Sequence, residues 1–115
     1  MRVLAIVLIG SIPAFAGPPE IVDAQAILQG EAWRFDVTVD HADTGWDHYA
    51  DGWGVYLPDG TELGYRVLAH PHVNEMPFTR SLSEVVIPKD AHLVLLRPRD
   101  SIHGEGADYE LTLER

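Results

Sequence analysis

Alternation of apolar and polar residues with a period of two is the feature that most constrains how this chain can fold. It is clearest at residues 32–40, where Trp33, Phe35, Val37 and Val39 alternate with polar or charged residues. A period of two places successive side chains on opposite faces of a β-strand. The segment is therefore predicted to be a strand with one buried face and one solvent-exposed face.

Similar β-rich runs recur along the chain, separated by turn residues. Strands are predicted at residues 20–28, 32–40, 53–57, 62–69, 83–87, 92–98 and 108–114. No segment carries a long apolar stripe of helical period. The sequence therefore predicts an all-β fold, a seven-stranded sandwich of the immunoglobulin or fibronectin type III kind. The predicted core comprises Trp33, Phe35, Val37, Val55, Leu95 and Leu111.

The first residues follow the pattern of a signal peptide that is cleaved on export. Arg2 gives a positive start, residues 3–12 form an apolar run, and Ala14-Phe15-Ala16 is a small-x-small cleavage site. The run is too short for a membrane span, which needs roughly 20 apolar residues. Residues 1–16 are predicted to be the signal peptide and residues 17–115 a single domain, periplasmic or secreted and without a stable membrane anchor.

The net charge of the chain limits the classes of binding partner that are compatible with it. The chain has 8 Lys and Arg against 18 Asp and Glu, a net charge of −10 that becomes −11 when Arg2 leaves with the signal peptide. Nucleic acid and anionic lipid are disfavoured, because both require a basic surface. A metal ion or another exported protein is compatible, although the acidity is equally explained by solubility alone. The sequence does not specify an oligomeric state.

The predicted connections are of two kinds. In an up-and-down sandwich every second connection lies at the same end. The connections 29–31, 58–61 and 88–91 are short turns, whereas 41–52, 70–82 and 99–107 are long and rich in His, acidic and aromatic residues. Five of the six histidines lie in the long set: His41, His48, His70, His72 and His103. Long loops on a rigid scaffold commonly carry function, so this end is predicted to be a binding surface.

Imidazole is the commonest metal-ligating side chain and suits copper and zinc. The predicted metal ligands are His48, His70, His72, His103 and Met76, with copper favoured and zinc next. Met76 would serve a cuprous ion. The alternative for any one loop histidine is a structural hydrogen bond to a carbonyl or a carboxylate.

The remaining loop residues are predicted to form a binding or structural network: Trp46, Asp47, Tyr49, Asp51, Phe78, Arg80 and Asp100. Within it, Arg80 is expected to pair with Asp47 or Asp100. No catalytic residues are assigned, since Ser101 lies beside Asp100 and close to His103 but in no nucleophile-elbow context. We therefore expect no enzyme. The alternative to metal binding is a non-catalytic interaction or accessory domain whose loop histidines are structural.

Residues 43–51 (Asp-Thr-Gly-Trp-Asp-His-Tyr-Ala-Asp) and 68–82 resemble segments of small exported bacterial proteins of unassigned function. The resemblance covers most of the chain after residue 16 and implies no particular activity or ligand. In size, β-architecture and His and Met usage the chain is also similar to periplasmic copper carriers, without a residue-by-residue match to their motifs. A cupredoxin-type site is excluded because it needs a Cys ligand and the chain has none.

Overall fold

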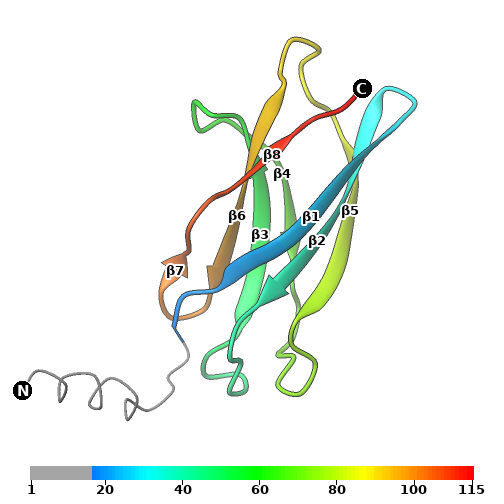
Figure 1. Cartoon of the computed structure of the whole chain (residues 1–115). Helices are drawn as coiled ribbons and strands as arrows, with labels where there is room; N and C mark the ends of the chain where they lie inside the picture. Colours follow the sequence, from blue (N-terminus) through cyan, green and yellow to red (C-terminus); the bar gives the residue numbers. More distant parts are fainter. Residues whose placement is uncertain (1–16) are drawn as a thin grey trace, which may run out of the picture.

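The computed structural model describes residues 17–115, so the predicted signal peptide lies outside the described residues. These residues form strands and loops without any helix (Figure 1), and hence no helix that could cross a membrane. The strands are β1 (Glu20–Gln29), β2 (Ala32–Asp40), β3 (Ala50–Tyr56), β4 (Glu62–Val67), β5 (Phe78–Val85), β6 (Leu93–Asp100), β7 (Gly104–Glu105) and β8 (Tyr109–Thr112).

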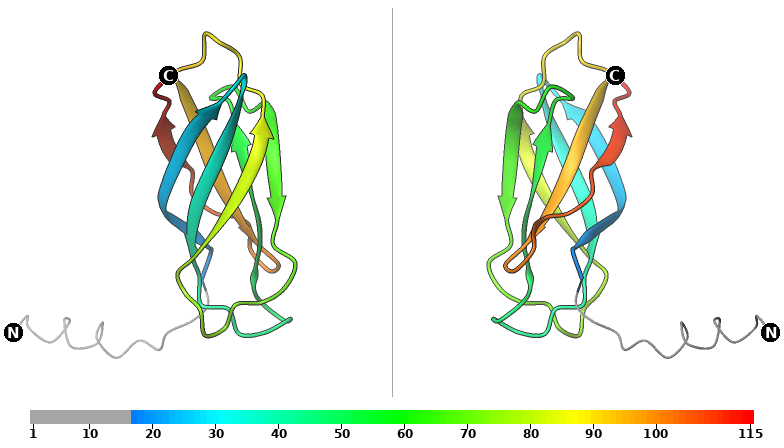
Figure 2. Two further views of the ribbon diagram at one scale, coloured as in Figure 1. Left: turned by 90° about the vertical axis from the view of Figure 1, so that its right-hand side faces the viewer. Right: turned by 90° about the vertical axis from the view of Figure 1, so that its left-hand side faces the viewer.

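The strands form two antiparallel sheets packed face to face (Figure 2). One sheet has the order β1-β2-β5; the other has the order β4-β3-β6-β7, with β8 also paired to β6. The predicted all-β sandwich is confirmed. In β2 and β6 alternate residues are buried, as expected for strands of a two-layer domain, whereas residues 52–56 of β3 are all buried.

The core lies between the sheets and begins with the alternating residues of β2. Trp33, Phe35, Val37 and Val39 are buried, and they face the buried residues of the opposite sheet, which include Trp53, Val55, Val94 and Leu96. Four of the six predicted core residues are fully enclosed. Leu95 and Leu111 are only partly buried, so the prediction was wrong for these two. The run from Leu93 to Leu96 alternates between faces instead of being covered on both.

Strand limits also differ from the prediction. The fifth strand begins at Phe78 and not at Ser83, and a short β7 was not expected. Phe78 pairs with Val39 of β2 and is buried. Pairing along the edge of β2 therefore draws residues 78–82 out of the expected loop and into a sheet.

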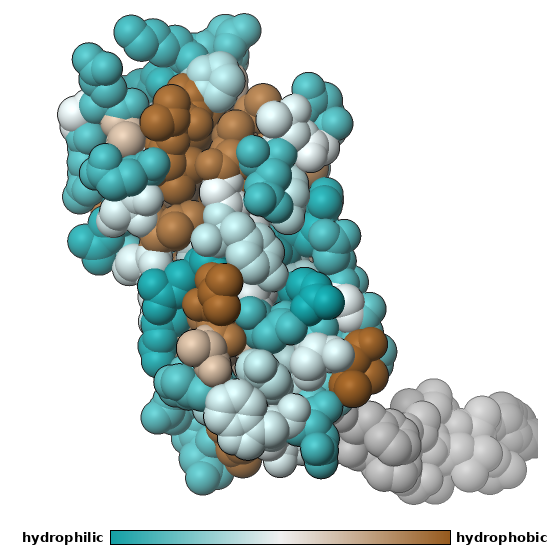
Figure 3. Space-filling view, turned by 180° about the vertical axis from the view of Figure 1, so that it is seen from behind, coloured by the Kyte–Doolittle hydropathy of each residue, from teal (hydrophilic) through white to brown (hydrophobic). Residues whose placement is uncertain are grey.

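The two kinds of connection lie at opposite ends of the sandwich, as predicted. Figures 1 and 2 show the β2–β3, β4–β5 and β6–β7 connections together at one end, which we call the long-loop end. The short turns β1–β2 and β3–β4 and the β5–β6 connection lie at the other end, with His92. From behind, Figure 3 shows a hydrophobic patch in the half away from the long-loop end. An open pocket of about 480 Å³ there is lined by Leu28, Gly30, Glu31, Val86, Ile87, Pro88, Lys89 and Arg115.

Candidate metal centre

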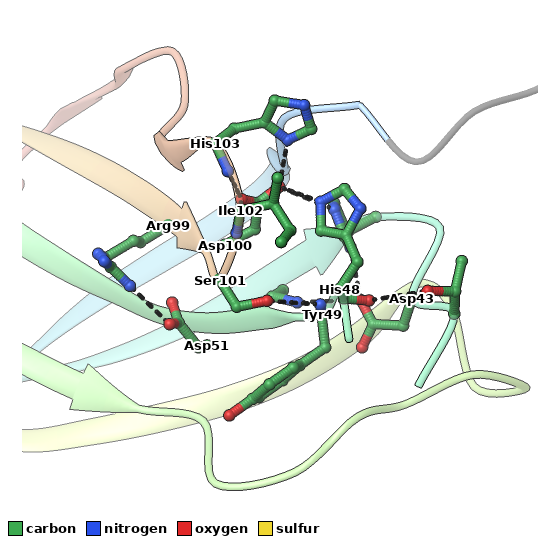
Figure 4. Close-up of polar contacts among 12 residues, drawn as sticks. Asp43, His48, Tyr49, Asp51, Arg99, Asp100, Ser101, Ile102 and His103 are labelled. Carbon is green, nitrogen blue, oxygen red and sulfur yellow. Dashed lines mark hydrogen bonds and ion pairs between the residues drawn. The ribbon is translucent and has the colours of Figure 1, made fainter. Parts of the chain in front are cut away.

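Asp100, the last residue of β6, is the centre of the long-loop end. Its carboxylate is fully buried. Oδ1 accepts hydrogen bonds from the backbone N–H groups of Ile102, at 3.0 Å, and His103. Oδ2 receives three imidazole nitrogens: His41 Nε2 at 3.1 Å, His48 Nε2 at 2.8 Å and His103 Nδ1 at 2.9 Å. Figure 4 shows His48 and His103 approaching Asp100 from different loops.

The surroundings of Asp100 favour its ionised form. Burial alone would raise the pKa of this carboxyl group. Hydrogen bonds from His103, His48 and the two backbone N–H groups outweigh that effect and hold the pKa well below its ordinary value. Asp100 is therefore a buried anion that is stabilised by hydrogen bonds from its neighbours.

His41 follows β2 directly and is also buried. Its Nδ1 lies 2.5 Å from Asp43 Oδ1 and its Nε2 faces Asp100, so the ring bridges two carboxylates. The local chain supports this geometry, because the backbone N–H of Asp43 donates to the carbonyl of His41 at 2.9 Å. A neutral imidazole has one N–H and one lone pair, so donating to both carboxylates requires a protonated ring.

The potential ligand atoms of four residues converge at one place. We call these residues the His–Asp cluster: His41, His48, His103 and Asp100. Ligand atoms of His41, His48 and Asp100 lie within 4.8 Å of one another, and His103 Nδ1 contacts the same Asp100 oxygen. Imidazole and carboxylate are ordinary ligands of divalent transition metals. The cluster has the donor set to hold such an ion in exchange for protons.

Solvent access is graded across the cluster. The side chains of His41 and Asp100 are fully buried, that of His48 is 13% exposed and that of His103 is 39% exposed. An ion would therefore reach the buried ligands from the side of His103.

Hydrogen bonds between loops hold the cluster in place. Ser101 and Tyr49 are joined by two bonds: Ser101 N–H donates to the Tyr49 carbonyl at 3.0 Å, and Tyr49 N–H donates to Ser101 Oγ at 3.1 Å. Nearby, Arg99 and Asp51 form an ion pair at 2.5 Å (Figure 4). These bonds fix the β2–β3 connection and the start of β3 to the end of β6.

A second group of histidines lies on the β4–β5 connection. The ring of His72 stacks on Phe78 with centroids 3.9 Å apart. The ring of His70, an exposed residue, has its centroid 4.5 Å from that of His72. We call His70, His72 and Phe78 the His72 stack. Arg80 Nη2 donates to His72 Nε2 at 3.0 Å and its guanidinium lies over Phe78.

The environment of His72 favours the neutral ring. Desolvation is the largest cause, and the charges of Arg80 and His70 add to it, so the pKa of His72 is lowered. A guanidinium can only donate, so Nε2 must be the acceptor and the proton must lie on Nδ1. Nδ1 is buried without a hydrogen-bond partner.

The structure thus divides the predicted metal ligands. His48 and His103 belong to the His–Asp cluster, whereas His70 and His72 belong to the His72 stack, and Met76 is partly buried against the core. Among the predicted network residues, Asp100 is central, Phe78 is in the stack and Asp51 pairs with Arg99. Trp46 is 68% exposed and packs edge-on against Tyr49, and Asp47 is exposed.

The expected pairing of Arg80 with Asp47 or Asp100 was wrong. Arg80 donates instead to the carbonyl of Thr79 and to His72, because β5 starts earlier than predicted and places Arg80 on a strand. Asp43 had no predicted role, and His41 was not among the predicted metal ligands. The only signal for them was the His-x-Asp spacing directly after a strongly alternating strand.

Comparisons with known proteins identify the fold more clearly than the family. No family model matches, so no copper-binding family is identified. The chain is 43% identical over 77 residues to a protein of Halomicrobium mukohataei named "Putative lipoprotein". The match covers 67% of this chain but 37% of that protein, so the chain spans well under half of its relative's length. That name does not support the expectation of a protein without a membrane anchor.

A crystal structure of a superoxide reductase in the oxidised state has the same fold, with a TM-score of 0.53 over 89% of this chain and 94% of the other. The two sequences are 17% identical, so the likeness shows the fold alone. It also corrects one expectation. We expected no enzyme because Ser101 lies in no nucleophile-elbow context, and this expectation is contradicted, because a protein with the same fold is an enzyme.

Proposed function

We propose that the protein is an exported transition-metal-binding protein and that His41, His48, His103 and Asp100 hold the ion. The observation that carries the proposal is the convergence of three imidazole nitrogens, at 2.8–3.1 Å, on one oxygen of a buried carboxylate. Ordinary loop histidines scatter along a surface. Here three of them from separate places in the sequence share one acceptor.

The donor set favours a divalent ion. Three imidazoles and one carboxylate suit cupric copper and zinc, and cupric copper stands highest in the affinity order for nitrogen and oxygen ligands. Met76 packs against the core and belongs to another loop, so the thioether expected for a cuprous ion is not part of this cluster. Copper is therefore the first ion to test and zinc the second.

Binding requires a change of protons at the cluster. In the hydrogen-bonded form, each ring nitrogen that faces Asp100 carries a hydrogen, because a carboxylate only accepts. A metal needs the lone pair of the same nitrogen. Ion uptake must therefore compete with protons, and affinity should weaken as pH falls through about 6.5, the ordinary pKa of imidazole.

Export is part of the proposal. The signal pattern of residues 1–16, with residues 17–115 as the exported domain, supports it, and so does similarity to a protein named as a lipoprotein. Whether the protein is released or held at a membrane would be decided by separating soluble and membrane fractions of the native host.

The test is calorimetric titration of the purified metal-free protein with cupric and zinc ions. Wild type should bind one ion, and His48→Ala should lose more than the roughly 10–100-fold in affinity that follows loss of a ligand's outer hydrogen-bond partner. His70→Ala is the matched control, since it removes an exposed loop histidine outside the cluster. Equally weak binding by wild type and His48→Ala would mean that the cluster is only a structural tie between loops.

A further inference from the structure

We infer that Asp43 is the positioning residue of the ion site. It holds the hydrogen of His41 on Nδ1 and so selects Nε2 as the ligating atom. The inference rests on the proposed function, because it describes how one ligand of that site is prepared. The observations that support it are the contacts of Asp43, a residue without a predicted role.

The carboxylate of Asp43 is fully buried, and its described hydrogen-bond partners are the His41 ring and two backbone N–H groups. Oδ1 lies 2.5 Å from His41 Nδ1 and accepts the backbone N–H of Ala50 at 3.0 Å. Oδ2 accepts the backbone N–H of His72 at 2.8 Å. Two backbone bonds, one from the first residue of β3 and one from the β4–β5 connection, fix the carboxylate, so its oxygen meets His41 from one defined direction.

That direction determines the tautomer of His41. A neutral imidazole carries its hydrogen on one nitrogen and its lone pair on the other. When an ion replaces the proton on Nε2, the hydrogen held by Asp43 stays on Nδ1, and the lone pair that becomes free is that of Nε2, which faces Asp100 Oδ2. A carboxylate behind a ligating histidine orients the ring and makes the ligand more basic.

The other two histidines of the cluster lack this support. Among the described residues, the ring hydrogen bonds of His48 and His103 each go only to Asp100. His41 alone lies between two different carboxylates. His41 therefore needs only to lose the proton on Nε2 when an ion enters, whereas His48 and His103 must reorient or change tautomer.

Asp43 also joins the β4–β5 connection to the site. The bond from the His72 backbone makes this connection part of the support for Asp43, although the His72 side chain points to Phe78 and Arg80. Side-chain variants of His70 keep this backbone bond, which explains why they serve as controls.

The decisive experiment compares zinc titrations of Asp43→Asn and Asp47→Asn. Both variants remove one negative charge from the same connection, but Asp47 is exposed and makes no described hydrogen bond. Asp43→Asn should bind zinc about 10–100-fold more weakly than wild type, and Asp47→Asn should match wild type. Equal affinities for the two variants would overturn the inference.

A measurement on wild type keeps the inference testable if Asp43→Asn does not fold. Nitrogen-15 NMR of the zinc-loaded protein should show the hydrogen of His41 on Nδ1. A hydrogen on Nε2, or Nδ1 as the zinc-bound atom, would contradict the role of Asp43. Failure of wild type to bind either ion would instead overturn the proposed function, so the two failures are distinguishable.

Discussion

The two groups of histidines at the long-loop end contain the same side chain in opposite surroundings. In the His–Asp cluster, imidazole nitrogens face buried carboxylates. In the His72 stack, the His72 ring packs between the rings of His70 and Phe78, and its Nε2 lone pair accepts a hydrogen bond from Arg80. The buried carboxylates favour a cation in the His–Asp cluster, whether a proton or a metal. In the His72 stack, burial and the guanidinium of Arg80 oppose a cation. Sequence proximity to other histidines therefore does not identify the histidines whose surroundings favour a cation.

The largest expected effect is that of Asp100→Ala. The substitution leaves three imidazoles and two backbone N–H groups without their acceptor, and removing one partner of a buried charged set typically costs about 3–5 kcal/mol. Denaturant unfolding of variant and wild type, both metal-free, measures the difference. A loss below about 1 kcal/mol, the range of exposed ion pairs, would show that the cluster does not hold the loops together.

The pH dependence of stability should distinguish the stack from the cluster. His72 has a lowered pKa in the folded protein, so the unfolded chain takes up its proton first, near the ordinary value of about 6.5. The stability associated with the neutral ring is fully present above that pH and is lost as pH falls toward the folded-state pKa. The melting temperature of metal-free protein should drop in this window.

Arg80→Gln sharpens this prediction, because it removes one of the charges that oppose protonation of His72. The drop in melting temperature between neutral and mildly acidic pH should become smaller than in wild type. An unchanged slope would mean that another histidine dominates the titration.

The smallest expected effect is that of His70→Ala. The residue is exposed, and its only described ring hydrogen bond is to the adjacent carbonyl of Pro71, at 3.2 Å. Its removal should change the free energy of unfolding by no more than about 0.5 kcal/mol. A larger loss would show that stacking against His72 matters to the fold and would narrow the contrast between the two groups.

The sequence by itself determined the architecture and the end of the sandwich at which the candidate site lies. The alternation around Phe35 and Val37 required a strand with one buried face, and the lack of a helical stripe left a sandwich as the economical solution. Short and long connections then had to gather at opposite ends, which placed five histidines at one end. These features depend on periods and lengths, and both can be read from the chain.

Only the tertiary structure decided which side chains meet. His41 and His48 reach Asp100 from 59 and 52 residues away, through strand register and loop conformation that local patterns do not encode. The same holds for Arg80. Its observed partner differs from the predicted one because residues 78–82 pair with β2 and place Arg80 on a strand. A hydrogen bond requires atoms to be placed within tenths of an ångström, whereas a hydrophobic pattern specifies only a face.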